Sequence, residues 1–71
     1  MLRLEKERER AGLSRSALAR LALMHPATVG QIESGYIGRP YPGQLSKLAA
    51  ALGFEDEPAR LLEEVSGDDG Q

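Results

Sequence analysis

The chain of 71 residues contains no cysteine and no tryptophan, and only 4% of it is aromatic. The absence of cysteine excludes disulfides, thiolate metal sites and a cysteine nucleophile, and it suits a reducing cytoplasm. No apolar run approaches the length that spans a membrane, and residues 2–11 are charged throughout rather than signal-like. We therefore expect a cytoplasmic protein.

Signatures of enzyme chemistry are missing too. The only histidine, His25, lacks the companions that a metal or catalytic site needs. There is no phosphate-binding glycine loop, no metal-ligand cluster, and no serine, histidine and carboxylate set at triad spacings. We assign no catalytic residue, no metal and no cofactor.

The short chain forms one domain, expected over residues 1–65, with residues 66–71 as a disordered acidic tail. A domain of this size buries only about 60% of its unfolded surface, so its stability margin is small and dimerisation would add to it.

The charge is unevenly distributed, although the formal net charge is only −2. Residues 1–53 carry eight basic and four acidic residues, a balance of +4, whereas residues 54–71 carry one basic and seven acidic residues, a balance of −6. The basic body is suited to an anionic partner, with the acidic end facing away. Composition alone favours the alternative, that both are ordinary solvated faces.

Helical spacing of apolar residues, with glycines and prolines at the breaks, predicts five helices and no strand. The first covers Leu2–Ala11, and the second follows the Ser14 cap and ends near Leu23. The third covers residues 26–34, the fourth opens at Pro42 or Gly43 and ends at Gly53, and the fifth covers Pro58–Val65.

The second and third helices are joined by a short turn, because the residue before Pro26 is pushed out of the helical region while the proline suits a first helical position. On the second helix, the expected buried face is Ala17, Leu18, Leu21 and Ala22. On the third, Val29, Ile32 and Glu33 share one side, and the small and polar residues Ala27, Gly30, Gln31 and Ser34 share the other. The outer side is therefore unusually poor in apolar residues.

This arrangement resembles the Xre family, the lambda-repressor and Cro-like helix-turn-helix proteins, over most of the chain. The matching residues form two blocks: Leu13-Ser14, Leu18-Ala19, Thr28-Val29, Ile32-Glu33 and Gly35, then Arg39-Pro40, Leu45, Leu48-Ala49 and Ala51-Leu52-Gly53. The resemblance implies an all-α fold, a compact five-helix lambda-repressor-like DNA-binding domain with the helix-turn-helix at the second and third helices. It also implies that the helix over residues 26–34 enters the major groove of DNA.

Three side chains of that helix are the base contacts that the resemblance implies. The Gln31 amide matches adenine N6 and N7, Thr28 offers a methyl to thymine or a hydroxyl to phosphate, and Ala27 can pack on a thymine methyl. Phosphate contacts, which set the register without reading sequence, are expected from the helix starts and from the segment after the third helix. They are Ser14, Arg15, His25, Ser34, Tyr36, Arg39, Tyr41, Gly43 and Gln44.

Two further positions matter for the fold. Glu33 points inward and needs a partner; in relatives an arginine of the first helix pairs with this glutamate, and Arg8 stands at the matching place. Leu23 occupies the turn position where relatives usually carry glycine, so the turn is either strained in a left-handed conformation or reshaped.

Two classes of function remain open. The first is a DNA-binding regulator, expected to be a repressor and a homodimer on a near-palindromic operator. The second is an antitoxin or another protein-interaction module that holds a partner protein through the acidic C-terminal part. The candidate dimer surface consists of Phe54, Leu61, Leu62 and Val65, although a five-helix domain needs some of these side chains for its own core.

Overall fold

The computed structural model of the protein describes residues 1–66, which form helical elements and a single isolated β-bridge. In chain order the elements are α1 (Arg3–Arg10), α2 (Arg15–Leu21), α3 (Pro26–Glu33), α4 (Pro42–Leu52) and the 3-10 helix η1 (Pro58–Leu62). The expected all-α class with five helical elements is confirmed. The predicted tail over residues 66–71 lies, except for Ser66, outside the described residues.

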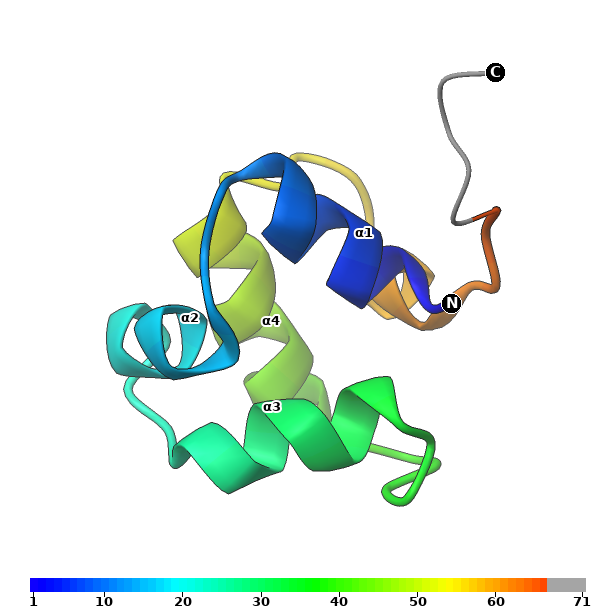
Figure 1. The fold of residues 1–71 in the computed structure, drawn as a ribbon. Coiled ribbons are helices and arrows are strands. Elements are labelled where there is room, and N and C mark those ends of the chain that lie inside the picture. Colours follow the sequence, from blue (N-terminus) through cyan, green and yellow to red (C-terminus); the bar gives the residue numbers. More distant parts are fainter. Residues whose placement is uncertain (67–71) are drawn as a thin grey trace.

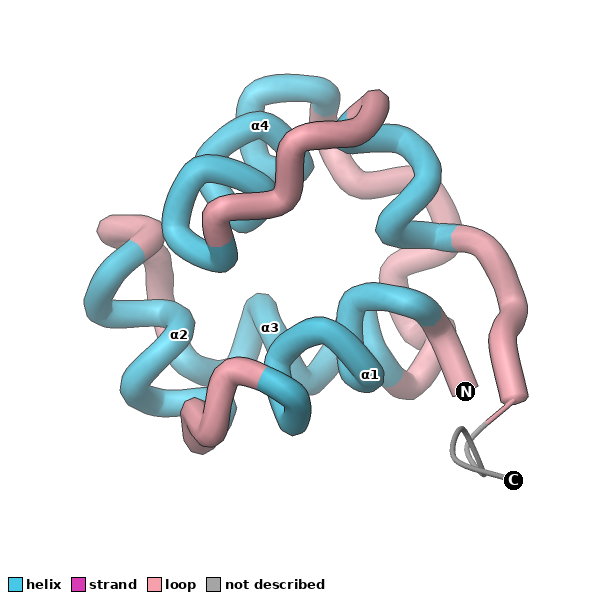
Figure 2. The backbone as a smooth tube through the Cα atoms, turned by 90° about the horizontal axis from the view of Figure 1, so that it is seen from above, coloured by secondary structure: helices cyan, strands magenta, loops and turns pink. Residues whose placement is uncertain are grey.

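The helices surround one hydrophobic core. α2 packs against α3 and α4, and η1 packs against α1 and α4. Figure 1 shows α3 along the lower edge of the molecule and α1 at the top, and Figure 2 places α4 across the core from α1. Every element supplies at least one side chain without exposed surface: Leu4, Leu18, Val29, Ile32, Leu48 and Leu61. α3 is thus held by one side only, at the edge of the domain.

The buried face of α2 differs from the prediction: Ala17 is only half-buried, Leu21 is exposed, and Ala19, which was not predicted, is buried. Leu18 and Ala19 are fully buried and Ala22 is 3% exposed, whereas Leu21 is 58% exposed. The expectation that Leu21 is buried was wrong. The spacing of apolar residues on α2 allows either a buried face that includes Leu21 or a neighbouring one that includes Ala19. Packing of α2 against α3 and α4 buries the face with Ala19.

The four α-helices are each followed within two residues by a residue of left-handed backbone. Three of these residues are glycines with φ of 75°, 85° and 67°: Gly12, Gly35 and Gly53. The fourth is Leu23, with φ of 58°. The Leu23 N–H donates to the Arg20 carbonyl at 3.2 Å, and the next N–H, of Met24, reaches back to Ala19 at 2.9 Å. This is the Schellman turn, which favours glycine at the Leu23 position, so the turn is strained rather than reshaped.

The fifth helix is shorter than predicted. η1 ends at Leu62, and the following residues are extended and pair with the N-terminus, where Leu2 and Glu64 form the β-bridge. The Arg3 N–H donates to the Glu63 carbonyl at 2.8 Å, and the Val65 N–H donates to the Met1 carbonyl at 2.8 Å. Backbone groups of Met1 and Arg3 thus bond to the Val65 N–H and the Glu63 carbonyl, and a longer fifth helix would have used the Val65 N–H internally.

Candidate nucleic-acid interface

The start of α3 is fixed by its first residue and by the N-cap residue before it. Pro26 needs no N–H partner there, and the His25 ring caps the helix because Nδ1 accepts a hydrogen bond from the Ala27 N–H at 3.0 Å. With Nδ1 acting as the acceptor, the proton of the neutral ring sits on Nε2. The exposed His25 therefore presents its donor outward at the beginning of α3.

The two sides of α3 differ as the sequence indicates. Val29 and Ile32 have no exposed surface, and Glu33 is 7% exposed. Ala27, Gln31 and Ser34 are exposed, while Thr28 and Gly30 are half-buried. The outer side consists of small or neutral polar residues, so α3 presents few apolar side chains to solvent.

The inner side of α3 is anchored by a buried ion pair. Glu33 accepts hydrogen bonds from Arg8 Nε at 2.7 Å and Arg8 Nη2 at 3.2 Å, and Arg8 Nη1 donates to the Leu13 carbonyl at 2.8 Å. The hydrogen bonds and charge of Glu33 raise the pKa of Arg8 above its ordinary value. The guanidinium thereby joins α1 to α3 and to the residue before α2.

A second arginine reaches the same carboxylate. Arg15 Nε donates to Glu33 Oε1 at 2.9 Å, although the Arg15 side chain is 52% exposed and that of Glu33 is fully buried. The sequence predicts Arg15 only as a phosphate contact, and the structure adds this contact with α3.

An open hollow of about 410 Å³ lies on the outer side of α3. Its lining brings together five of the predicted contact residues with the glycine of the helix: Arg15, Ala27, Gly30, Gln31, Ser34 and Tyr36. Gly30 is the one lining residue that was not predicted from the sequence to contact DNA. An isolated glycine inside a helical pattern is the signal that could have drawn attention to it.

Most of the other predicted phosphate contacts lie outside the hollow, and Tyr36 lies in its lining. Ser14 caps α2 by accepting from the Ala17 N–H at 3.0 Å. Arg39 is exposed and forms no ion pair with any residue among 1–66. Tyr36 and Tyr41 are 80% and 75% exposed. These side chains are open to an anionic partner.

Some polar groups in this set already have partners within the chain. The Ser34 hydroxyl donates to the Gln31 carbonyl at 3.2 Å. The Gln44 side-chain oxygen accepts from the Tyr41 N–H at 2.9 Å, and the Gln44 N–H donates to the Tyr41 carbonyl at 2.9 Å. The Gln44 N–H, which the sequence analysis expected to donate to phosphate, is therefore already bonded within the chain. The neighbouring Gly43 is exposed.

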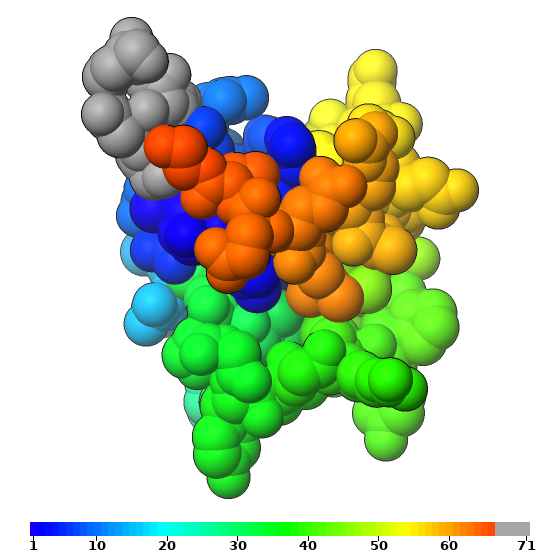
Figure 3. Space-filling view, turned by 90° about the vertical axis from the view of Figure 1, so that its right-hand side faces the viewer, coloured from blue at the N-terminus to red at the C-terminus, as the bar shows by residue number. Residues whose placement is uncertain are grey.

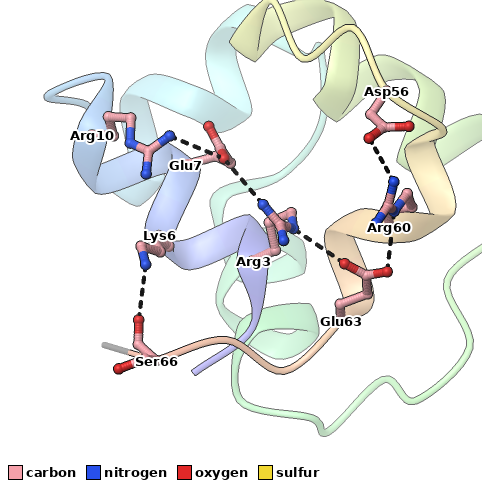
Figure 4. A network of polar contacts seen from close by, with 8 residues as sticks. All are labelled: Arg3, Lys6, Glu7, Arg10, Asp56, Arg60, Glu63 and Ser66. Atoms are coloured by element: carbon pink, nitrogen blue, oxygen red, sulfur yellow. Dashed lines mark hydrogen bonds and ion pairs between the residues drawn. The ribbon is translucent and has the colours of Figure 1, made fainter. Parts of the chain in front are cut away.

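The acidic end of the described chain and the segment that follows α3 occupy neighbouring parts of the same face. Figure 3 shows residues 55–66 across the upper half of one face and the segment after α3, up to the start of α4, across the lower half. Several of the acidic side chains are paired with cations. Glu63 contacts Arg3 at 3.3 Å and Arg60 at 3.1 Å, and Arg60 also contacts Asp56 at 2.7 Å (Figure 4).

The candidate dimer residues are partly used by the domain itself. Leu61 has no exposed surface, so its assignment to a dimer surface was wrong: the core of this small domain takes it. Phe54 and Leu62 are half-buried against the same core, and Val65 is half-buried.

No helix within residues 1–66 is long and apolar enough to cross a membrane. The same residues contain no group of three or more histidine or acidic side chains placed to hold a metal ion.

The comparison with known families agrees with the geometry of α2 and α3. A family model described as a helix-turn-helix domain matches residues 2–62, a range that includes all five helical elements. The comparisons with curated proteins and with solved structures found no match.

Proposed function

The chain belongs to the helix-turn-helix domain family, and from this premise we propose that it is a sequence-specific transcriptional regulator of the Xre type. In this proposal α3 enters the major groove of DNA with its outer side facing the bases. The observation that carries the proposal is the difference between the two sides of α3. Its outer side has small and polar side chains, and its inner side is anchored by the buried Arg8–Glu33 ion pair. Such a helix is rigidly held yet has an outer side free for a partner.

Gln31 is the main base-reading residue of the proposal. It is exposed, it lines the hollow, and its amide offers the donor and acceptor that adenine presents in the major groove. Ala27 and Thr28 would add apolar contact with thymine methyl groups.

Phosphate contacts flank this surface. Exposed donors stand at both ends of α3, with His25 at its start and Arg39 in the segment after it. The set comprises Ser14, His25, Ser34, Tyr36, Arg39, Tyr41 and Gly43; the Gln44 N–H is already bonded to the Tyr41 carbonyl. These groups position the helix and supply affinity that depends on salt.

The proposal includes a homodimer on a near-palindromic operator in the cytoplasm. Two copies of α3 would be spaced about one helical turn, roughly 34 Å, to read two half-sites. With Leu61 excluded by burial, Phe54, Leu62 and Val65 remain as the dimer surface. Repression follows because a dimer on its operator blocks access to that DNA.

An antitoxin or other protein-interaction role through the acidic end is the weaker candidate. Glu63 and Asp56 already pair with arginines of this chain, and Glu64 contacts the N-terminal ammonium at 3.3 Å. Exposed pairs of this kind are weak, but a basic partner would have to replace them.

Selection of bound duplexes from a random library tests the proposal, with Gln31→Ala as the variant. We expect the parent to recover a sequence of two related half-sites, and Gln31→Ala to lose base preference at one position in each. If the parent recovers no preferred sequence, the proposed function is wrong. If Gln31→Ala binds all duplexes more weakly with the same preference, Gln31 is a backbone contact.

A further inference from the structure

A side chain from α2 lies against α3 at Gly30. A Cβ built on Gly30 would lie 3.7 Å from Arg15 Nη1 and 3.8 Å from Arg15 Cδ. The end of the Arg15 side chain therefore lies beside the middle of α3, within contact distance of the point where a side chain of residue 30 would begin. Both residues line the hollow together with Gln31. The outer side of α3 thus carries a positive charge that its own sequence lacks.

The guanidinium of Arg15 is also held in one orientation. Its Nε donates to Glu33 Oε1 at 2.9 Å, and the fully buried Glu33 carboxylate is itself fixed by two hydrogen bonds from Arg8. Neither Nη1 nor Nη2 of Arg15 has a hydrogen-bond partner among residues 1–66. The two terminal nitrogens of this charged, half-exposed side chain are thus left for a partner other than Glu33.

We propose that Arg15 reads guanine in the DNA site, as a second base-contacting residue beside Gln31. This inference rests on the proposed function and replaces the phosphate contact expected for Arg15 from the sequence. Arginine paired with guanine O6 and N7 is the commonest specific contact in the major groove, and it requires two parallel N–H donors such as Nη1 and Nη2. Because Glu33 already restricts the side chain, less conformational entropy is lost on binding than for a free surface arginine.

The buried Glu33 keeps Arg8 as a partner when Arg15 is removed, which makes the inference testable. Arg8 alone provides the buried Glu33 with a charge partner and two hydrogen bonds. Arg15→Ala removes a half-exposed side chain and one of the three hydrogen bonds to Glu33, so it should remain folded and melt well above Glu33→Ala. Arg20→Ala is the matched control, because Arg20 is an exposed arginine of the same helix that does not line the hollow.

The experiment selects duplexes from a random library with the parent, Arg15→Ala and Arg20→Ala, and then measures binding to single-base variants of the recovered site. We expect one guanine per half-site to be preferred by the parent and by Arg20→Ala. In Arg15→Ala its discrimination against other bases should fall by about 5- to 150-fold, with preferences elsewhere retained.

Gly30 provides a second, independent variant. Gly30→Leu keeps the charge of Arg15 but fills its place on α3, so it should lose the same guanine preference, whereas Gly30→Ala should retain it because its Cβ would only touch Arg15. The inference is overturned if Arg15→Ala weakens binding to all duplexes equally with a smaller salt slope, which indicates a phosphate contact. It is also overturned if the guanine preference survives in Arg15→Ala. If the parent shows no sequence preference at all, the proposed function fails together with it.

Discussion

Replacing Leu23 by glycine should stabilise the protein. Leu23 has φ of 58° in a turn whose counterparts after α1, α3 and α4 are all glycines. The leucine side chain is 82% exposed, so almost no packing is lost when it is removed. The substitution therefore acts on backbone conformation alone.

The magnitude follows from two opposing terms. A non-glycine residue in the left-handed conformation is unfavourable by about 1–2 kcal/mol. The relief of this strain is partly offset, because glycine has more conformational freedom in the unfolded chain, which lowers the stability of the folded protein by about 0.5–1 kcal/mol. We expect a net stabilisation of about 0.5–1 kcal/mol, or a rise in Tm of about 2–8 °C for a domain of this size.

Thermal unfolding followed by circular dichroism measures the effect, with two controls. Leu23→Ala removes most of the side chain but keeps the Cβ and hence the strain, so it should melt close to the parent. Gly12→Ala should lower the stability by a similar amount, because Gly12 has φ of 75° and an added Cβ would meet no atom within 4 Å. The reasoning is refuted if Leu23→Gly melts at or below the parent, or if Leu23→Ala gains as much as Leu23→Gly.

Two further predictions concern the anchor of α3 and the DNA contacts. Glu33→Ala leaves the Arg8 guanidinium, whose side chain is only 11% exposed, without its carboxylate, and should cost about 3 kcal/mol or more; a thermal melt equal to the parent would show that the pair does not stabilise the fold. With three or four phosphate contacts in each subunit of a dimer, the slope of log K against log salt should be about −5 to −7, measured by fluorescence anisotropy on a recovered duplex; a flat dependence would argue against phosphate contacts.

The order and approximate bounds of the helices were predictable because single residues at the helix ends determine where each helix begins and ends. Pro26 and Pro42 start helices, and Gly35 and Gly53 follow helix ends at positions where a left-handed backbone is required. The early end of η1 was not predictable, because the spacing of Leu61, Leu62 and Val65 also fits a continuous helix. Pairing with the N-terminus, more than sixty residues away, decides it.

The outer side of α3 was predictable only in part. Helical periodicity separates Gln31 from Ile32 without any knowledge of the fold. The position of Arg15 over Gly30 depends on how α2 crosses α3 and on a contact with Glu33, eighteen residues away. No pattern of neighbouring residues predicts that contact. The positive charge of Arg15 on the outer side of α3 was therefore not predictable from the sequence.

The central claim is that the outer side of α3 is the surface that meets DNA. Amide NMR spectra of the labelled protein, recorded with and without a random-sequence duplex of about 20 base pairs at low salt, test it most directly. We predict the largest shifts at Ala27, Gly30 and Gln31, including the Gln31 side-chain amide, with residues 55–64 nearly unchanged. Large shifts confined to residues 55–64, with α3 unaffected, would contradict the account.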